Sequence, residues 1–193
     1  HFPGMQGKLY QADYLKLDIH TLFSGQYRVI GNFPYNISSQ IFFKILEDKD
    51  RVPEVVCMIQ KEVAERIAEK PGSKTYGILS VLLQAWYDIE YLFTVDENVF
   101  NPPPKVKSGV IKLVRNNVTD LGCDERLFKT VVKTSFGMRR KMLRSSLKSM
   151  FPQGSPVLAT DLFRMRPEQL SVQQFVDLTN MVAAERNNDE QTK

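Results

Sequence analysis

Two apolar runs with a helical pattern between them constrain the fold of this chain most strongly. Residues 27–31 and 54–60 are each continuous enough to predict strands that are buried on both faces, which is typical of parallel sheets. Between them, Ser38 opens a segment whose apolar residues recur at helical spacing. A strand, a helix and a second strand in this order predict an α/β architecture.

The same alternation continues to about residue 116. We expect a short strand at 8–11, helices at 61–70 and 76–86, and strands at 88–94 and 109–115. The last two strands are expected to form an antiparallel pair at the edge of the sheet.

Beyond residue 116 the pattern is helical only. Helices are expected at 124–136 and 139–150. Ser171, with Gln174 three residues later, predicts a capping box at the start of a third helix.

The tetrapeptide Asn32-Phe33-Pro34-Tyr35 follows the first apolar strand directly. The Asn32 side-chain oxygen and a carbonyl flanking Pro34 can both accept from an exocyclic amine, which turns the nitrogen lone pair toward an incoming methyl group. Tyr35 can stack on a base that has left its helix. An ordinary strand-to-turn junction, in which proline ends the strand, explains the same residues.

A second motif lies just before the last strand. Residues 100–108 read Phe-Asn-Pro-Pro-Pro-Lys-Val-Lys-Ser, so an aromatic side chain precedes a stiff proline stretch. Phe100 is either a stacking residue held in place by the prolines or a core residue in a connector.

Together these segments resemble the small-subunit rRNA adenine N6,N6-dimethyltransferase family. The family pattern Asn-Leu-Pro-Tyr-Asn-Ile-Ser is matched at 32–38 except for Phe33, and its Phe-x-Pro-x-Pro-x-Val-x-Ser pattern is matched at 100–108. Further family blocks are similar to residues 60–63, 73–81 and 136–141. The resemblance runs from about residue 9 to 181.

The resemblance implies a fold and a domain organisation. It implies a partial Rossmann-like, S-adenosylmethionine-dependent methyltransferase domain at 1–116. A small all-helical RNA-binding domain is then expected at 117–186, and a frayed tail at 187–193.

The resemblance also implies roles for individual residues. Asn32, Pro34 and Tyr35 would carry methyl transfer, and Phe100 would stack on the adenine opposite Tyr35. Asp13, after the expected strand at 8–11, would bind the cofactor together with Asn32, although an Asp in a turn or helix cap fits as well. Lys107 departs from the family pattern, in which Asp is common.

The glycine-rich turn that would hold the methionine half of the cofactor is not found in the sequence. The chain also begins at His1 rather than Met. We therefore expect an N-terminally truncated and inactive form that binds S-adenosylmethionine weakly. Residues 1–20 would then be displaced or disordered, or the edge at 27–31 would pair with a second copy of a protein that is monomeric when intact.

Basic residues indicate a polyanionic partner. The net charge is +4 and the pI is about 9.0. Five basic residues gather in the helical part: Arg139, Arg140, Lys141, Arg144 and Lys148. On one helix, Arg140, Arg144 and Lys148 would form a stripe for phosphates of small-subunit rRNA or the immature small subunit, or simply a solvated face.

Other residue types exclude several classes of protein. Cys57 and Cys123 are the only cysteines, which predicts a cytoplasmic protein without disulfides and, at Cys57, an inert core thiol. His1 and His20 have no partners at metal-ligand spacing, so no metal is expected. No apolar run approaches the length of a membrane span.

The leading function that the resemblance implies is dimethylation of adenine N6 in small-subunit rRNA, on two adjacent adenines near the 3′ end. Three alternatives stand beside it. One is the related large-subunit rRNA adenine methyltransferase, which shares both motifs. A DNA adenine-N6 methyltransferase is disfavoured because its motif usually carries two prolines. The third is a non-catalytic, rRNA-binding factor of small-subunit assembly.

Overall fold

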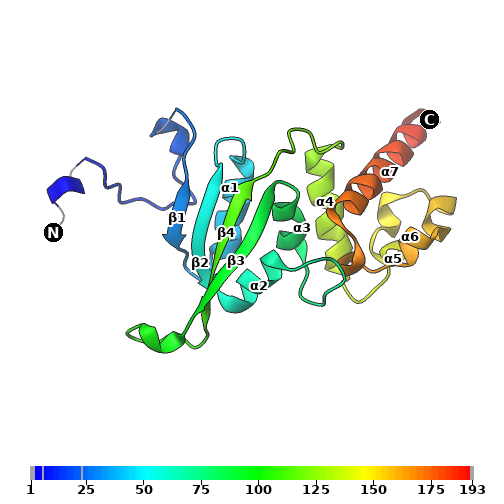
Figure 1. Ribbon diagram of the computed structural model, residues 1–193. Helices are drawn as coiled ribbons and strands as arrows, with labels where there is room; N and C mark the ends of the chain where they lie inside the picture. The colour runs from blue at the N-terminus through cyan, green and yellow to red at the C-terminus, as the bar shows by residue number, and fades with distance from the viewer. Residues whose placement is uncertain (1–2, 6, 23, 192–193) are drawn as a thin grey trace.

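A four-stranded mixed sheet forms the centre of the computed structural model, which describes residues 3–5, 7–22 and 24–191 (Figure 1). The strands are β1 (Val29–Asn32), β2 (Glu54–Gln60), β3 (Tyr87–Val95) and β4 (Ser108–Arg115), in the order β1-β2-β4-β3. β1 and β2 are parallel, whereas β4 is antiparallel to both β2 and β3. The predicted α/β class is confirmed, and so is the antiparallel pairing of the last two strands.

Three helices cover one face of this sheet: α1 (Ser38–Glu47), α2 (Lys61–Ala68) and α3 (Ile78–Gln84). On β2, alternate side chains such as Cys57 and Ile59 point into the core beneath them. On the opposite face, Ile30 is 84% exposed and Phe93 is 55% exposed. The prediction that the first two strands are buried on both faces is therefore wrong, because no element within the described residues covers the second face.

The strand predicted at 8–11 is also wrong. These residues lie outside the sheet and lead away from it (Figure 1), and Leu9 is 79% exposed. An extended segment becomes a strand only when a neighbour pairs with its N–H and C=O groups, and the outer edge of β1 has no such neighbour in the described structure. The described part of 1–20 is thus displaced from the sheet; residues 1–2 and 6 lie outside the described residues.

The rest of the chain is helical. Its main elements are α4 (Glu125–Gly137), α5 (Leu143–Ser146), α6 (Asp161–Arg164) and α7 (Val172–Gln191). The Asp124 carboxylate accepts from the Leu127 N–H at 2.6 Å and begins α4. The predicted capping box is present, since Ser171 and Gln174 exchange hydrogen bonds at 2.9 and 3.2 Å. α4 and α7 pack through the stacked rings of Phe136 and Phe175, 6.0 Å apart.

Two predictions about this part are corrected. The helix expected at 139–150 is broken into α5 and the 3-10 turn η4 (Lys148–Met150), because the Leu143 N–H donates to the Met165 carbonyl at the start of α5. The tail expected from 187 is helical as far as Gln191, as a continuation of α7. Residues 192–193 lie outside the described residues. None of the described helices combines the length and apolarity that a bilayer crossing requires.

Candidate active site at the carboxyl end of β1

Asn32 is the last residue of β1, and its side chain is exposed. The next residue, Phe33, is buried and packs edge-on against Phe42 of α1, with ring centroids 5.6 Å apart. The Phe33 N–H also donates to the Met58 carbonyl of β2 at 3.0 Å. These contacts fix the backbone from which the Asn32 carboxamide projects.

The turn after Asn32 leaves two oxygens available as acceptors. The Pro34 carbonyl already accepts from the Ile37 N–H at 3.2 Å. No hydrogen bond within the described part of the chain uses the Asn32 carboxamide or the Phe33 carbonyl that precedes the proline. An exocyclic amine offers two N–H donors, so these two acceptors match its hydrogen-bonding capacity.

A hydrogen bond joins this turn to the second motif. The hydroxyl groups of Tyr35 and Ser108 lie 2.6 Å apart, and Tyr35 is otherwise half-buried. Ser108 is fully buried at the start of β4, where it pairs in register with Gln60 of β2. The two motifs, which are far apart in the sequence, therefore meet at the carboxyl ends of β1 and β2.

The loop between β3 and β4 carries Phe100 and is closed by Asp96. The Asp96 carboxylate accepts from the Asn98 N–H at 3.0 Å and forms an ion pair with Lys107 at 3.1 Å. These contacts, with the Asn98 hydrogen bond first, hold the pKa of Asp96 below its usual range. Phe100 follows the 3-10 turn η3 (Glu97–Val99) and is half-buried; its stacking on a base stays a prediction.

Helix α2 approaches β4 very closely at Gly109. A Cβ atom at this position would lie 2.8 Å from the Cβ of Ala64 and 3.0 Å from the side chain of Tyr91. Because neither neighbour is the end of a long flexible chain, only glycine fits without displacement. The contact fixes the strand that begins with Ser108.

S-adenosylmethionine is the cofactor that the predicted chemistry requires, and the described residues offer acceptors for the amine that would receive its methyl group. Asn32 and the Phe33 carbonyl stand where a target amine can be oriented. No glycine turn within the described residues lies beside them to receive the remainder of the cofactor.

Comparison with known proteins identifies the family. A family model described as Ribosomal RNA adenine dimethylase matches residues 2–184. The chain belongs to the ribosomal RNA adenine dimethylase family. Ribosomal RNA small subunit methyltransferase A of Parabacteroides distasonis is 64% identical to this dimethylase chain over 179 residues, which cover 93% of this chain and 67% of that protein. The chain thus spans about two thirds of this curated relative, and the predicted rRNA adenine dimethyltransferase family is confirmed.

Two solved structures share the fold of this dimethylase chain. A dimethyladenosine transferase from Plasmodium falciparum is similar with a TM-score of 0.72 and 23% identity, over 90% of this chain and 72% of that one. The 23S rRNA methyltransferase ErmE is similar with a TM-score of 0.59 and 20% identity, over 92% of this chain and 75% of that one. The predicted Rossmann-like methyltransferase class is confirmed; at these identities the likeness concerns the fold alone.

Asp13, the expected cofactor ligand, lies in the segment before β1. Its carboxylate accepts from the Leu15 N–H at 3.0 Å within an exposed turn. Lys44 anchors that turn by donating to the Tyr14 carbonyl at 2.5 Å. Lys44 lies in the last turn of α1, which leads from Asn32 back toward the start of β2. No contact among the described residues joins Asp13 to Asn32, and the role of Asp13 stays a prediction.

Arg139 holds the helical part of the dimethylase against the α/β part. Its guanidinium donates to the carbonyls of Lys74 and Tyr76, the latter at 2.7 Å, and lies 5.9 Å from the Phe136 ring. The Gly72 N–H reinforces this junction by donating to the helical part. Arg139 therefore has a structural task that its basic sequence context did not reveal.

The other four basic residues are exposed: Arg140, Lys141, Arg144 and Lys148. They do not share one helix, since Arg140 precedes α5 and Lys148 belongs to η4. The predicted continuous helical stripe is therefore wrong, whereas the surface position of these side chains suits contact with RNA.

Sequence reasoning did not find the roles of Ser108 and Gly109. Both stand at the start of a predicted strand, directly after the proline stretch, and a hydroxyl next to a glycine there is a usable signal. The identity of their partners, Tyr35 and Ala64, follows only from the fold.

Proposed function

We propose that the chain carries the base-binding edge of an S-adenosylmethionine-dependent enzyme. It would dimethylate N6 of two adjacent adenines near the 3′ end of small-subunit (16S) rRNA. The main support is the pair of acceptors at Asn32 and Phe33, in a turn that Tyr35 joins to Ser108. The 64% identity to a small-subunit methyltransferase favours this substrate over large-subunit rRNA.

The chain's own residues would act by orientation. Asn32 and the carbonyl before Pro34 accept the two amine hydrogens, which directs the nitrogen lone pair out of the ring plane. Tyr35 and Phe100 stack on the adenine. When bound, S-adenosylmethionine supplies an electrophilic methyl group. The departing proton becomes acidic as methylation proceeds, so a strong general base is not required.

The helical part, residues 117–186, would bind RNA through its exposed basic residues. Such binding supports action on the immature small subunit and a role in its biogenesis in the cytoplasm. Arg139 would contribute mainly by orienting this part.

Tritium transfer from S-adenosylmethionine to undermethylated small subunits tests the proposal. We would compare this chain with one extended to the length of its curated relatives, each with and without Asn32→Ala. We expect transfer by the extended chain and its loss in the variant. Small-subunit binding without any transfer would favour the non-catalytic assembly factor, and transfer only to large subunits would favour the related large-subunit enzyme. Calorimetry should find weak S-adenosylmethionine binding by the 193-residue chain itself, because no glycine turn within the described residues stands beside Asn32 to receive the rest of the cofactor.

A further inference from the structure

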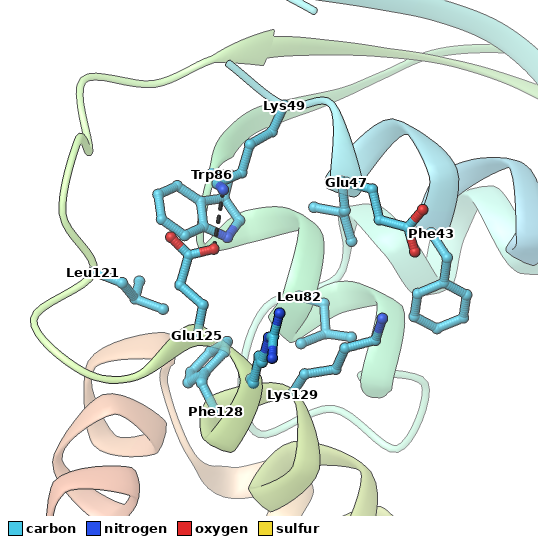
Figure 2. A pocket seen from close by; sticks show the side chains of 11 residues that line it. Phe43, Glu47, Lys49, Leu82, Trp86, Leu121, Glu125, Phe128 and Lys129 are labelled. Atoms are coloured by element: carbon cyan, nitrogen blue, oxygen red, sulfur yellow. Dashed lines mark hydrogen bonds and ion pairs between the residues drawn. The ribbon is translucent and has the colours of Figure 1, made fainter. Parts of the chain in front are cut away.

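Two lysines of α4 converge on one aromatic ring of α1. The Nζ atoms of Lys129 and Lys133 lie 5.1 and 4.8 Å from the centroid of the Phe43 ring. Phe43 is only half-buried, and Lys133 is exposed. Figure 2 shows Lys129 reaching from α4 toward the side of α1 that carries Phe43. Two positive charges are thus held at one point between the α/β part and the helical part.

Neither lysine has a carboxylate within ion-pair distance among the described residues. Two other cations nearby are paired: Lys49 lies 3.0 Å from Glu125, and Arg66 lies 2.9 Å from Glu62. Like charges four residues apart on a helix repel each other and lower its stability. An anion placed between the two ammonium groups would remove this repulsion.

A groove runs past this point between α1 and α4. On one side of Phe43 lies a cavity of about 390 Å³, whose walls include Leu46, Trp86 and Phe128. On the other side lies a second cavity of about 320 Å³, which reaches Ser39. Phe43 lines both cavities, so both border its ring along α1. Ser39 is only seven residues beyond Asn32.

The charges that line the groove are mainly positive. Arg126 and Lys129 face the larger cavity from α4, opposite Glu47 of α1. Arg139 lines the smaller cavity, and its hydrogen bonds to backbone carbonyls leave its charge uncompensated. With Lys133 added, four cations face a single unpaired carboxylate, which favours an anionic occupant.

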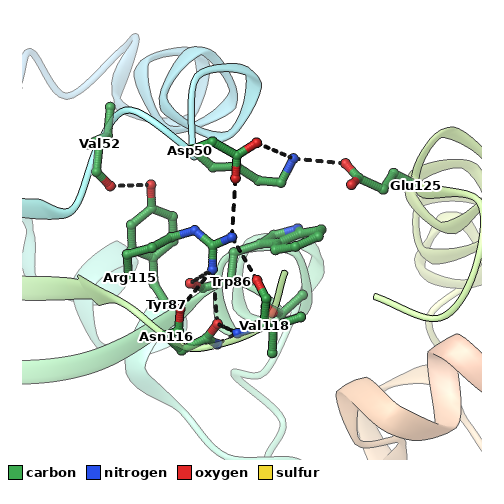
Figure 3. A network of polar contacts seen from close by, with 10 residues as sticks. Asp50, Val52, Trp86, Tyr87, Arg115, Asn116, Val118 and Glu125 are labelled. Atoms are coloured by element: carbon green, nitrogen blue, oxygen red, sulfur yellow. Dashed lines mark hydrogen bonds and ion pairs between the residues drawn. The ribbon is translucent and has the colours of Figure 1, made fainter. Parts of the chain in front are cut away.

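The walls of the groove are held in place at both ends. Arg139 ties the end of α4 to the Tyr76 carbonyl. At the other end, Arg115 donates to the Asp50 carboxylate at 3.3 Å and to the Val118 carbonyl at 2.8 Å (Figure 3). A groove fixed in this way needs little reorganisation to receive an extended ligand.

We propose that this groove binds a strand of the substrate RNA and that Lys129 and Lys133 contact its phosphates over the Phe43 ring. The proposal rests on the proposed function, since it assigns a path to the same RNA. Phosphodiester groups repeat along a strand, so one can lie between the two lysines while a neighbouring phosphate meets Arg126. This places an RNA contact outside the basic residues at 139–148 that the sequence singles out.

Salt-dependent binding of an undermethylated small-subunit rRNA transcript tests the proposal on the 193-residue chain. In Lys129→Ala/Lys133→Ala, loss of two phosphate contacts should lower the slope of log K against log salt by about 1.4–1.8. The ratio of the parent chain's RNA-binding constant to that of the double variant should then fall about tenfold between about 50 and 200 mM salt. Lys8→Ala/Lys16→Ala removes the same charge from exposed positions in the N-terminal segment and should keep the parent slope.

A second variant and three outcomes make the test decisive. Phe43→Leu retains apolar volume but removes the ring, so it should weaken binding less than the double lysine variant does. If the salt slope of Lys129→Ala/Lys133→Ala equals that of Lys8→Ala/Lys16→Ala, the groove proposal is wrong. The proposed function is then unaffected. Absence of RNA binding by the parent chain overturns both the groove and the proposed function. If the variant binds RNA normally but no longer binds small subunits, the groove serves a protein partner and the RNA proposal is wrong.

Discussion

The hydroxyl oxygens of Tyr35 and Ser108 lie 2.6 Å apart, and this contact joins the turn after β1 to the first residue of β4. Ser108 is fully buried, whereas Tyr35 is half-buried. A buried hydroxyl that loses its partner incurs a desolvation cost, so the contact stabilises one arrangement of the two motifs.

Removing either hydroxyl should therefore destabilise the chain. We expect Tyr35→Phe and Ser108→Ala each to lower the free energy of unfolding by about 1 kcal/mol, measured by urea denaturation. The double variant should show a coupling of about 0.5–1.5 kcal/mol. Tyr10→Phe, at an exposed residue, serves as the control. Strictly additive effects would show that the hydroxyls do not interact.

Asn32→Ala should abolish the orientation of the target amine. In a chain extended to the length of its relatives, we expect turnover to fall by about 10² or more, by analogy with loss of one oriented transition-state group. RNA affinity should barely change, because in the proposed role the carboxamide would contact only the target base. Asn36→Ala, at a neighbouring exposed position, is the matched control. Near-normal methyl transfer by the Asn32 variant would exclude the role proposed for it.

Gly109→Ala should weaken the sheet where α2 contacts it. The added methyl group would meet the Cβ of Ala64 at 2.8 Å, so we expect a loss of about 1–3 kcal/mol in the free energy of unfolding. Gly25→Ala, which has no heavy atom within 4 Å of the new Cβ, should change it by less than about 0.5 kcal/mol. Equal stability of the two variants would contradict the close approach.

Substitution of Arg139 should lower stability, whereas substitution of Arg140 and Arg144 should weaken RNA binding. Arg139→Ala removes hydrogen bonds to the carbonyls of Lys74 and Tyr76, so stability should fall by about 1.5–3 kcal/mol. Arg140→Ala/Arg144→Ala should leave the melting temperature nearly unchanged and lower the salt slope of RNA binding by about one unit per lost contact. An unchanged slope would mean that the exposed pair is only solvated.

The sequence predicted those elements that depend on local pattern. The strand at 54–60 and the capping box at Ser171 were correct because apolar continuity and side-chain capping act over a few residues. The strand at 8–11 failed because its existence depends on a neighbour rather than on its own residues. The helix at 139–150 failed because the Met165 carbonyl, distant in sequence, begins α5 at Leu143.

The same distinction between local pattern and contacts distant in sequence applies to the candidate site. Asn32 and Tyr35 can be predicted as site residues because a single tetrapeptide contains both the amide acceptor and the aromatic ring. The partners that hold them, Phe42 and Ser108, were not assigned, since packing and pairing across the sheet decide them. Arg139 was read as an RNA contact because charge alone does not show that backbone carbonyls lie within its reach.

Only alternate residues of β1 form backbone hydrogen bonds in the parallel pairing with β2. The Phe33 N–H points toward β2 and donates to Met58, and the two-residue period turns that of Gly31 the same way. The N–H groups of Ile30 and Asn32 point to the outer edge, where the described structure has no strand. Deuterium should therefore replace hydrogen at Ile30 and Asn32 much faster than at Gly31 and Phe33. Within the described structure, hydrogen bonds to β2 alone therefore limit how often the strand that presents Asn32 opens.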